Sequence, residues 1–437
     1  MNGRKMNGLA TFLTKEKNVE RATYIWNMAG SLLNAFQSVI FLMIITRVLG
    51  IGEAGIFTIA YADANLFLNL GKYGMRYFQV SDYQNQFSFR QYVKSRYLTV
   101  LLMVSVSWIY VFTAAYINSY SFHKISIILW MCVWKAADAL EDVFHGDLQK
   151  CGRLDIAGKM LCTRVVSMTA VWALLLMLTK NQMIATVIAA GFTFFITIRM
   201  IYLVRSFYSM PLKVAWNDLK VDAKMLELLR IVFPLFLSMF LSFYIGNAPR
   251  YAIDRQLSDE LQACYGFIAM PVFVIGLLSS FIFNPIITRM SVLWNENKNR
   301  EFGLRAFRQM VIVLIITGVC MAGAYILGIP VLSWIYHTDL SDFKVQLMLM
   351  LVGGGFLGLS GLLQMLITIQ RGQRQLVIIY IFVTVIAIIF SNGVVREYGM
   401  NGAVCLYILL MGLLCIGFVL IFIRNLLTNR THTTIEK

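Results

Sequence analysis

Residues 35–62 read AFQSVIFLMIITRVLGIGEAGIFTIAYA, which is two apolar runs joined by a short connection that contains glycine. Extended on both sides, the runs cover 24–46 and 53–77. Each run has the roughly 20 residues that a helix needs to cross about 30 Å of hydrocarbon. The pattern predicts two membrane-spanning helices with a tight turn between them at Gly50 and Gly52. It indicates an all-α integral membrane protein, because a chain in lipid must satisfy its backbone hydrogen bonds internally.

The same pattern recurs along the whole chain, which is 59% hydrophobic and has a mean hydropathy of +0.70. We count about twelve apolar runs of spanning length. They cover 24–46, 53–77, 97–117, 122–145, 157–178, 184–205, 228–249, 262–287, 307–328, 344–369, 375–395 and 402–424.

Lysine and arginine are concentrated in alternate connections between these runs, and the formal net charge of the chain is +16. With the N-terminus in the cytoplasm, the cytoplasmic segments hold 29 of the 38 basic residues, and the outer connections hold only seven. This asymmetry follows the positive-inside rule and predicts that both termini are cytoplasmic. The charge is spread over seven short segments, so it does not form the continuous basic face that would bind nucleic acid. Residues 1–20 are polar and show no cleavable signal, so we expect the first span to direct insertion.

A weak internal repeat indicates two halves of six spans each. When the chain is shifted by 208 positions, TRVLGIGEAGIF (46–57) lies over DRQLSDELQACY (254–265). The segment KVAWNDLKVDAKMLELLR (213–230) is predicted to be an amphipathic helix at the membrane surface. We therefore expect an N-terminal six-helix lobe over 1–210 and a C-terminal six-helix lobe over 211–437, which begins with this amphipathic linker. Duplicated halves are typical of transporters that bind their substrate between them.

The sequence contains no motif that predicts catalysis, a cofactor or a metal site. Gly50, Gly52 and Gly55 match G-x-G-x-x-G, but they join two spans and lack the βαβ unit that nucleotide binding requires. The seven cysteines form no C-x-x-C pair, and the four histidines are scattered. The outer connections are short and leave no room for an inserted soluble domain. We therefore expect no enzyme activity, no cofactor and no metal. Gly354 and Gly358 form a G-x-x-x-G that favours helix packing within the bundle.

A polar stripe in the second span is the first candidate site. Thr58, Asn65, Asn69, Lys72 and Arg76 are separated by steps of seven, four, three and four, which place them on one face of a continuous helix. Polar and ionisable groups inside a membrane are costly and usually functional. The stripe is predicted to line a wet cavity with positive charge at its inner mouth. Alternatively, Lys72 and Arg76 extend to the inner interface.

Further polar groups lie near this stripe in the sequence. The first span has a polar face that includes Asn27 and Asn34, whose amides suit sugar hydroxyls but also join helices to one another. Arg47 follows at the outer end of that span. Asp63 points away from the stripe and is expected to pair with a neighbouring helix or to bind a coupling ion.

The fourth span carries the densest group of charges, in WKAADALEDVFHGD (134–147). Lys135, Asp138 and Asp142 share one stripe of the predicted helix. Lys135 and Asp138 are three residues apart and can neutralise each other. Alternatively, these groups form a proton or ion relay or contact a ligand. Arg164, in the fifth span, is expected either to extend to the interface or to pair with an acid of the fourth span.

The seventh span ends in NAPRYAIDR (247–255), where a proline precedes two arginines. The proline predicts a broken or kinked helix end. Arg250 and Arg255 could hold a phosphate by bidentate hydrogen bonds, or they could pair with Asp254 or Asp259 at the surface.

Three segments resemble Wzx-type polysaccharide flippases of the multidrug/oligosaccharidyl-lipid/polysaccharide (MOP) exporter superfamily. They are residues 35–62, ALEDVFHGDLQKCGRLDIAGK (139–159) and RYAIDRQLSDELQACYGFIAM (250–270). The resemblance implies a V-shaped, pseudo-twofold architecture like that of MATE transporters, in the bacterial cytoplasmic membrane. It also implies that the protein flips an undecaprenyl-pyrophosphate-linked oligosaccharide for surface polysaccharide biosynthesis. The partners that it implies are membrane lipid and the polysaccharide polymerase and glycosyltransferases of the same pathway. The implied cationic cavity would draw on Arg47, Lys72, Arg76, Lys135, Arg250 and Arg255.

Two other functions remain open at this point. An ion-coupled exporter of small cationic molecules would use Asp63, Asp138 or Asp142 to bind a proton, sodium or a cationic drug. A membrane glycan polymerase or glycosyltransferase would need a carboxylate for bond formation, and the short outer connections speak against it.

Overall fold

The computed structural model describes residues 8–82, 84–212, 222–283 and 286–435, and nearly all of these residues are helical. The N-terminal α-helices are α1 (Gly8–Thr14), α2 (Val19–Val48), α3 (Ile51–Lys72), α4 (Met75–Ser81), α5 (Phe89–Asn118), α6 (Phe122–Lys150), α7 (Leu154–Thr179) and α8 (Gln182–Leu203). The remaining α-helices are α10 (Ala223–Gln256), α11 (Asp259–Phe283), α12 (Ile287–Asn295), α13 (Asn299–Gly323), α14 (Ile329–Tyr336), α15 (Lys344–Ile369) and α16 (Gln373–Ile435). Short 3₁₀ segments, η1 (Arg205–Phe207) and η4 (Ser341–Phe343), and the π-helical η3 (Ala324–Gly328) complete the described chain.

The twelve apolar runs of the sequence overlap these helices, and the run 262–287 also includes residues 284–285, which lie outside the described part of the chain. The last two runs share α16, where Gly399 has a non-helical backbone (φ 56°, ψ −134°) that only glycine adopts easily. Within the described residues, nine helical stretches are long and apolar enough to cross a membrane, and α3 and α6 are not among them. A count of twelve spans therefore remains a prediction.

The second predicted run, 53–77, is not one helix. Tyr73 (φ 54°) and Gly74 (φ 65°) both have left-handed backbone conformations, so α3 ends at Lys72 and a separate helix, α4, begins at Met75. A left-handed residue at a helix end is a common stop signal, and the second one turns the chain again. The prediction of one continuous polar face from Thr58 to Arg76 is therefore wrong, because Arg76 belongs to α4.

The chain divides into two compact units, Met1–Phe240 and Leu241–Lys437, which we call unit 1 and unit 2. The border lies inside α10, whereas the sequence predicted lobes over 1–210 and 211–437. Residues 213–221, which form the first half of the predicted amphipathic linker, lie outside the described residues. α10 continues through Pro249 as α-helix, so the expectation of a broken helix end is wrong, whereas that of a kinked one stays a prediction.

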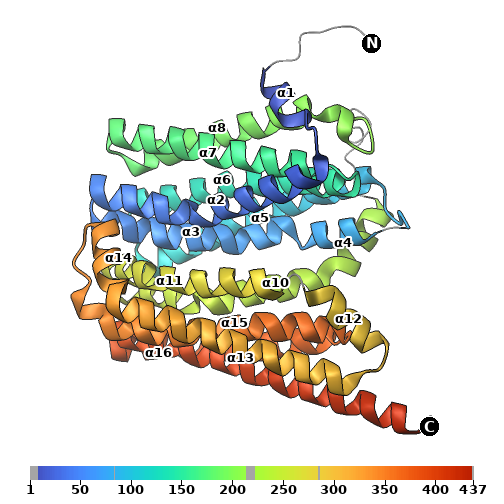
Figure 1. Cartoon of the computed structure of the whole chain (residues 1–437). Coiled ribbons are helices and arrows are strands. Elements are labelled where there is room, and N and C mark those ends of the chain that lie inside the picture. The colour runs from blue at the N-terminus through green and yellow to red at the C-terminus, as the bar shows by residue number, and fades with distance from the viewer. Residues whose placement is uncertain (1–7, 83, 213–221, 284–285, 436–437) are drawn as a thin grey trace. The chain divides into compact units, whose positions relative to one another are not determined.

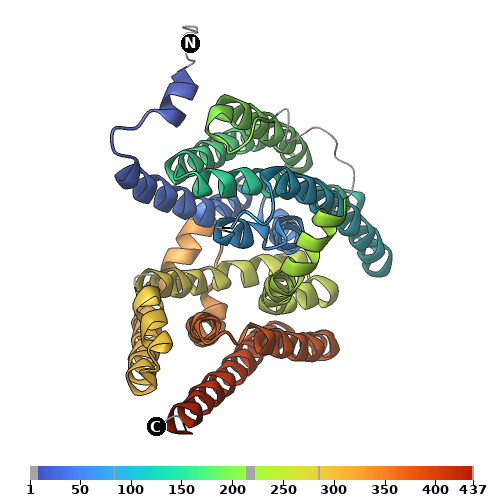
Figure 2. The same ribbon diagram turned by 90° about the vertical axis from the view of Figure 1, so that its right-hand side faces the viewer.

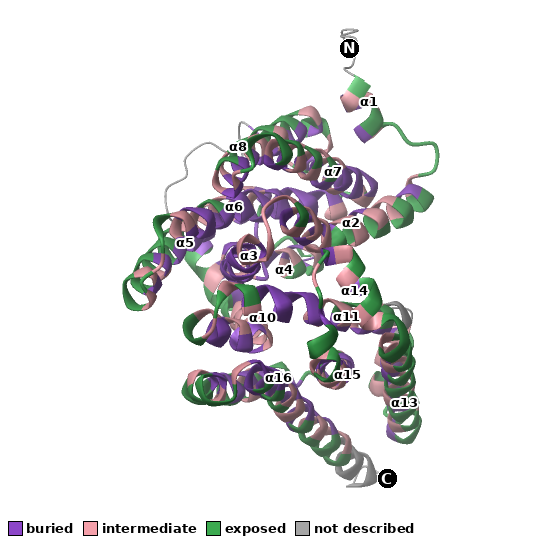
Figure 3. Ribbon diagram, turned by 90° about the vertical axis from the view of Figure 1, so that its left-hand side faces the viewer, coloured by how far each residue is buried: buried purple, intermediate pink, exposed green. Residues whose placement is uncertain are grey.

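In unit 1, α6 is the central helix. It packs against α3, α5, α7 and α8, and α2 packs against α7. Figure 2 shows the same helices nearly end-on. Most residues of α3 and α6 are buried, and Figure 3 colours both helices largely purple. Because protein surrounds these two helices, they keep polar side chains that a lipid-facing helix would not tolerate.

Two apolar clusters enclose the middle of α6. Phe41 of α2, Phe57 of α3, Trp134 of α6 and Trp172 of α7 form an aromatic cluster with ring centroids 4.4–6.3 Å apart. A second cluster includes Phe144 and Leu148, near the other end of α6. Lys135, Asp138, Glu141 and Asp142 of α6 lie between these two clusters along the helix.

Unit 2 is built around α15, which packs against α11, α13 and α16. A Cβ atom at Gly354 would lie 3.0 Å from Val272 of α11, and one at Gly358 would lie 3.2 Å from Val313 of α13. The predicted packing role of this G-x-x-x-G is confirmed, because the missing side chains let α15 approach both neighbours closely.

Candidate substrate-binding site

The candidate site is a buried cluster of charged side chains centred on α6. Lys135, Asp138, Glu141, Asp142 and His145 are all buried, and steps of three, three, one and three residues place them on one broad face of the helix. A buried charge must be paired or otherwise neutralised, so the partners of each group decide what the cluster can do.

Arg164 of α7 is the main partner of the first two acids. Its Nε lies 2.6 Å from Oε2 of Glu141, and its Nη1 contacts Oδ1 of Asp138. Asp138 also accepts a hydrogen bond from Lys135 Nζ at 3.2 Å, and Nε2 of His145 lies 3.3 Å from Oε1 of Glu141. Of the two roles expected for Arg164, pairing with acids of the fourth span is therefore the correct one.

The third acid, Asp142, is held by two arginines from other helices. Arg96 of α5 donates to Oδ2 of Asp142 at 2.9 Å, and Nη1 of Arg76 on α4 lies 3.8 Å from Oδ1. Arg96 also donates to the carbonyl oxygen of Gly71 at 2.6 Å, so it connects the end of α3 to α6. A Cβ at Gly71 would lie 2.6 Å from Sδ of Met103, which shows how closely α3 and α5 approach each other here.

Lys72 is the cation of this cluster that has no direct partner. It forms no ion pair or hydrogen bond with any residue that the structure describes, although it lies within electrostatic range of Asp142 and Asp138. Lys72, Arg76, Arg96, Lys135 and Arg164 are five cations, and Asp138, Glu141 and Asp142 are three anions. With His145 neutral, the cluster has an excess of two positive charges. Because the three carboxylates already have basic partners, the excess is available to an anionic ligand near Lys72.

The rest of the α3 stripe adds neutral polar groups beside Lys72. Asn65 and Asn69 are partly buried, and each side-chain nitrogen donates to the backbone oxygen four residues earlier, at 2.7 and 2.8 Å. Their side-chain oxygens accept no hydrogen bond from the described part of the chain, so they can accept from hydroxyl groups. Nζ of Lys135 lies 4.8 Å from the ring centre of Tyr61, one turn before Asn65. The stripe thus combines a cation with two acceptor oxygens.

Other residues predicted for the site lie elsewhere in unit 1. Asn27 is exposed and Asn34 is partly buried on α2, whereas the neighbouring Gln37 is buried and donates to Thr169 of α7 at 3.2 Å. Arg47 is exposed near the end of α2. Asp63 is buried on α3 within electrostatic range of Cys132 on α6. Among the residues that the structure describes, Asn27 forms no hydrogen bond with the charged cluster.

Arg250 and Arg255 belong to unit 2. Arg250 is partly buried, donates to Asn247 Oδ1 at 3.0 Å and lies within electrostatic range of Tyr265 and Tyr407. Arg255 is exposed. Lys72 belongs to unit 1, so a site that these arginines share with Lys72 remains a prediction.

The sequence reasoning missed Arg96 and His145 as members of the cluster. In the sequence Arg96 lies just before the run 97–117, and no local pattern distinguishes it from Arg90 or Lys94. His145 lies four residues after Glu141, the spacing at which two side chains meet on a helix. This spacing is the sequence signal that could have placed His145 in the cluster.

Neither a protein-family model nor a curated protein sequence matches the chain. Solved structures do match it. The lipid II flippase MurJ, in an inward closed conformation, has a TM-score of 0.68 at 14% identity over 95% of this chain and 90% of that one. An inward-facing multidrug resistance MATE transporter of the MOP superfamily has a TM-score of 0.63 at 12% identity, over 95% and 99%. The chain therefore shares the fold of these two proteins.

A third match is a MOP superfamily transporter from Pyrococcus furiosus, with a TM-score of 0.57 at 13% identity over 98% of this chain and 99% of that one. That structure is described as having a reversed polarity of its binding pocket, which suggests a different function for that protein.

Proposed function

We propose that this protein is a transporter that moves an undecaprenyl-pyrophosphate-linked oligosaccharide across the bacterial cytoplasmic membrane for surface polysaccharide biosynthesis. The observation that supports it most is the positive excess around Lys72, inside a cluster whose three carboxylates already have basic partners. A membrane-buried cation costs about 2.5–3.5 kcal/mol on insertion scales, so one without a direct partner is expected to serve a ligand. A pyrophosphate supplies the missing negative charge.

The proposed contacts follow from the chemistry of each group. Lys72 and Arg76 bind the pyrophosphate, Arg76 being the second partly exposed cation of the cluster. Asn65 and Asn69 accept hydrogen bonds from the first sugars. Arg96, Lys135 and Arg164 neutralise the acids and hold α3, α5, α6 and α7 in place. Asn27, Asn34, Arg47, Arg250 and Arg255 remain proposed contacts of the larger glycan. Alternating access of two lobes would move the polar part while the prenyl chain stays in lipid.

An ion-coupled exporter of small cations is the second candidate, because MATE exporters share the fold. Binding a cation in this cluster would require a carboxylate that is free of basic partners. Asp138 has Lys135 and Arg164, Glu141 has Arg164 and His145, and Asp142 has Arg96 and Arg76. The arrangement therefore favours an anionic substrate.

The test is leaflet transfer in sealed proteoliposomes. Undecaprenyl-pyrophosphate-linked oligosaccharide is incorporated in the vesicles, and an impermeant glycan-modifying enzyme outside reports how much becomes accessible. Lys72→Gln is compared with Lys224→Gln, which removes the same charge from an exposed position of unit 1. We expect transfer by the wild type and by Lys224→Gln, and at least a tenfold slower rate for Lys72→Gln.

Two results would overturn the proposal. If the wild type transfers no lipid-linked glycan with or without ion gradients, but accumulates a cationic dye under a proton or sodium gradient, the exporter is correct. If Lys72→Gln transfers the glycan at the wild-type rate, the substrate does not depend on the positive excess of this cluster.

A further inference from the structure

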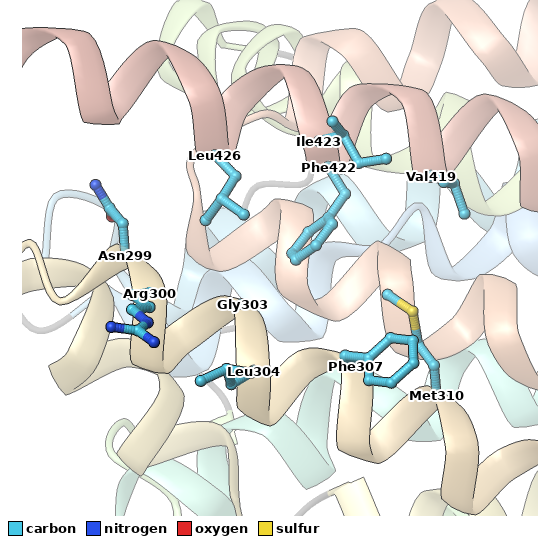
Figure 4. Close-up of a pocket in the computed structure, with 10 residues that line it drawn as sticks. All are labelled: Asn299, Arg300, Gly303, Leu304, Phe307, Met310, Val419, Phe422, Ile423 and Leu426. Carbon is cyan, nitrogen blue, oxygen red and sulfur yellow. The ribbon is translucent and has the colours of Figure 1, made fainter.

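The first half of α13, in unit 2, borders an apolar groove. The groove lies between α13 and the last part of α16 and has a volume of about 480 Å³. Its walls include Leu304 and Phe307 on one side and Phe422 and Ile423 on the other, and Asn299 and Arg300 lie at one end (Figure 4). Leu304 and Phe307 are 62% and 65% exposed, so the groove is not covered by another helix of the described chain.

The groove lies at the predicted cytoplasmic end of a membrane span. It extends along α13 from Asn299 to Met310, and eleven residues of α-helix rise by about 16 Å. The predicted span covers 307–328, so the groove runs from the headgroup region, at Asn299 and Arg300, into the edge of the hydrocarbon. The end with Arg300 is the end that the charge distribution predicts to be cytoplasmic. The headgroup and the first part of an acyl chain of a cytoplasmic-leaflet lipid are therefore expected at the level of the groove.

A second pocket lies beside the groove and is strongly basic. It is formed by α12 and α13, has a volume of about 630 Å³, and is lined by Arg289, Arg305 and Arg308. Glu301 pairs with Arg305 at 2.7 Å, whereas Arg289 and Arg308 are exposed and have no carboxylate partner among the described residues. The pocket therefore has an excess of two positive charges.

The groove and the basic pocket meet at Leu304, which lines both. A ligand that occupies both has an apolar chain and an anionic headgroup close to each other. Arginine guanidinium groups bind phosphate oxygens in a bidentate manner, and basic pockets between helices on the cytoplasmic side bind anionic lipid headgroups. Gln309 also lines the pocket, and its side-chain oxygen is buried without a hydrogen-bond partner, so it can accept from a headgroup hydroxyl.

We propose that α12, α13 and α16 bind an anionic phospholipid of the cytoplasmic leaflet. An acyl chain lies in the α13–α16 groove, and the phosphate is bound by Arg289 and Arg308. A volume of about 480 Å³ suits one acyl chain and is too small for a long polyprenyl chain. The basic pocket favours a phospholipid over an apolar helix of a partner protein. This site does not depend on which substrate the protein transports.

Native mass spectrometry of the purified full-length protein in neutral detergent tests this proposal. Cardiolipin, phosphatidylglycerol and phosphatidylcholine are titrated separately, and the bound fraction is measured. We expect the two anionic lipids to bind at least tenfold more tightly than phosphatidylcholine. The double variant Arg289→Gln/Arg308→Gln should lose this preference. Arg396→Gln, an exposed arginine of the same unit, is the charge control and should keep it.

A second variant tests the groove separately from the charge. A Cβ at Gly303 would lie 3.3 Å from Leu426 across the groove, so Gly303→Leu fills it, whereas Gly318 on the same helix faces open space. Gly303→Leu should weaken binding of all three lipids, and Gly318→Leu should not. Elution at the wild-type volume in size-exclusion chromatography shows that each variant is folded.

Three results would overturn the proposal. Equal binding of anionic and neutral lipids by the wild type would show an ordinary lipid-facing surface. Displacement of cardiolipin by millimolar inorganic phosphate would assign the basic pocket to a soluble anion. Displacement by stoichiometric undecaprenyl phosphate would assign the whole site to a polyprenyl carrier.

Discussion

Replacing Arg164 with glutamine tests whether the charged cluster holds unit 1 together. Arg164 joins α7 to two acids of α6, and the side chains of Arg164, Asp138 and Glu141 are 5%, 8% and 1% exposed. Breaking a buried ion pair by removing one partner costs about 3–5 kcal/mol, because a charge is left buried and uncompensated. Asp138 keeps Lys135 and Glu141 keeps His145, so we expect about 3 kcal/mol, at the lower end of this range.

The assay is reversible unfolding in mixed micelles, followed by tryptophan fluorescence, because Trp134 and Trp172 lie in the aromatic cluster on α6 and α7. The control is Arg305→Gln, which breaks an i,i+4 pair with Glu301 whose side chains are 33% and 48% exposed. Exposed pairs of this kind contribute about 0.3–0.5 kcal/mol. The double variant Arg164→Gln/Glu141→Gln should regain part of the lost stability, because Asp138 is then the only one of the two acids that lacks its arginine. If Arg164→Gln and Arg305→Gln lower the free energy of unfolding equally, the cluster does not stabilise the unit and our reasoning is wrong.

Further predictions concern close packing and pH. A Cβ at Gly158 of α7 would lie 2.6 Å from the backbone carbon of Trp26 on α2, so Gly158→Ala should cost about 1–3 kcal/mol of unfolding free energy, whereas Gly191→Ala, which faces open space, should be neutral or stabilising. Equal effects of the two substitutions would contradict the close approach of α2 and α7. Burial of Asp82, in the connection before α5, opposes its ionisation, but hydrogen bonds from the Gln86 N–H, the Tyr92 hydroxyl and the Phe87 N–H outweigh this and hold its pKa below the usual value. A lowered native pKa means that the stabilisation is fully present above the unfolded pKa of about 3.9 and is lost as the pH falls through the native value. Thermal unfolding of the wild type between about pH 3 and pH 7 should show this loss. Asp82→Asn should be less stable than the wild type at neutral pH, and its stability should depend less on pH in acid. If the pH curves of the two proteins are parallel, Asp82 makes no such contribution.

The positions of the helices could be predicted from the sequence because long apolar runs have few alternatives as secondary structure. The end of α3 could not be predicted in the same way. Its signals were Gly71 and Gly74, and a glycine within an apolar run is compatible with either a continuing helix or a stop. Because α3 ends at Lys72, Arg76 does not extend the polar stripe of α3. It belongs to a separate helix, α4, and lies near Asp142.

The candidate site could be predicted only in part. Spacing along one helix placed Lys135, Asp138 and Asp142 together, and it placed Asn65 and Asn69 beside Lys72. Spacing does not report which residues of other helices meet that face. Arg96 and Arg164 reach the acids from α5 and α7, and their identity as partners is a property of tertiary packing. Only the structure shows that Arg164 forms ion pairs with two acids, whereas Lys72 has no direct partner among the described residues.

The contact between Arg164 and Asp138 joins residues that are 26 positions apart in the chain, which has a consequence for how α6 enters the membrane during synthesis. At about 5–20 residues per second, Arg164 is made roughly 1–5 s after Asp138. During this interval Asp138 has Lys135 and Glu141 has His145 on the nascent helix itself, and neither acid has its arginine. α6 is also too polar to be among the helical stretches that qualify as spans by themselves. We therefore expect α6 to remain beside the insertion machinery until α7 arrives, so that the two helices enter the bilayer as a neutralised pair.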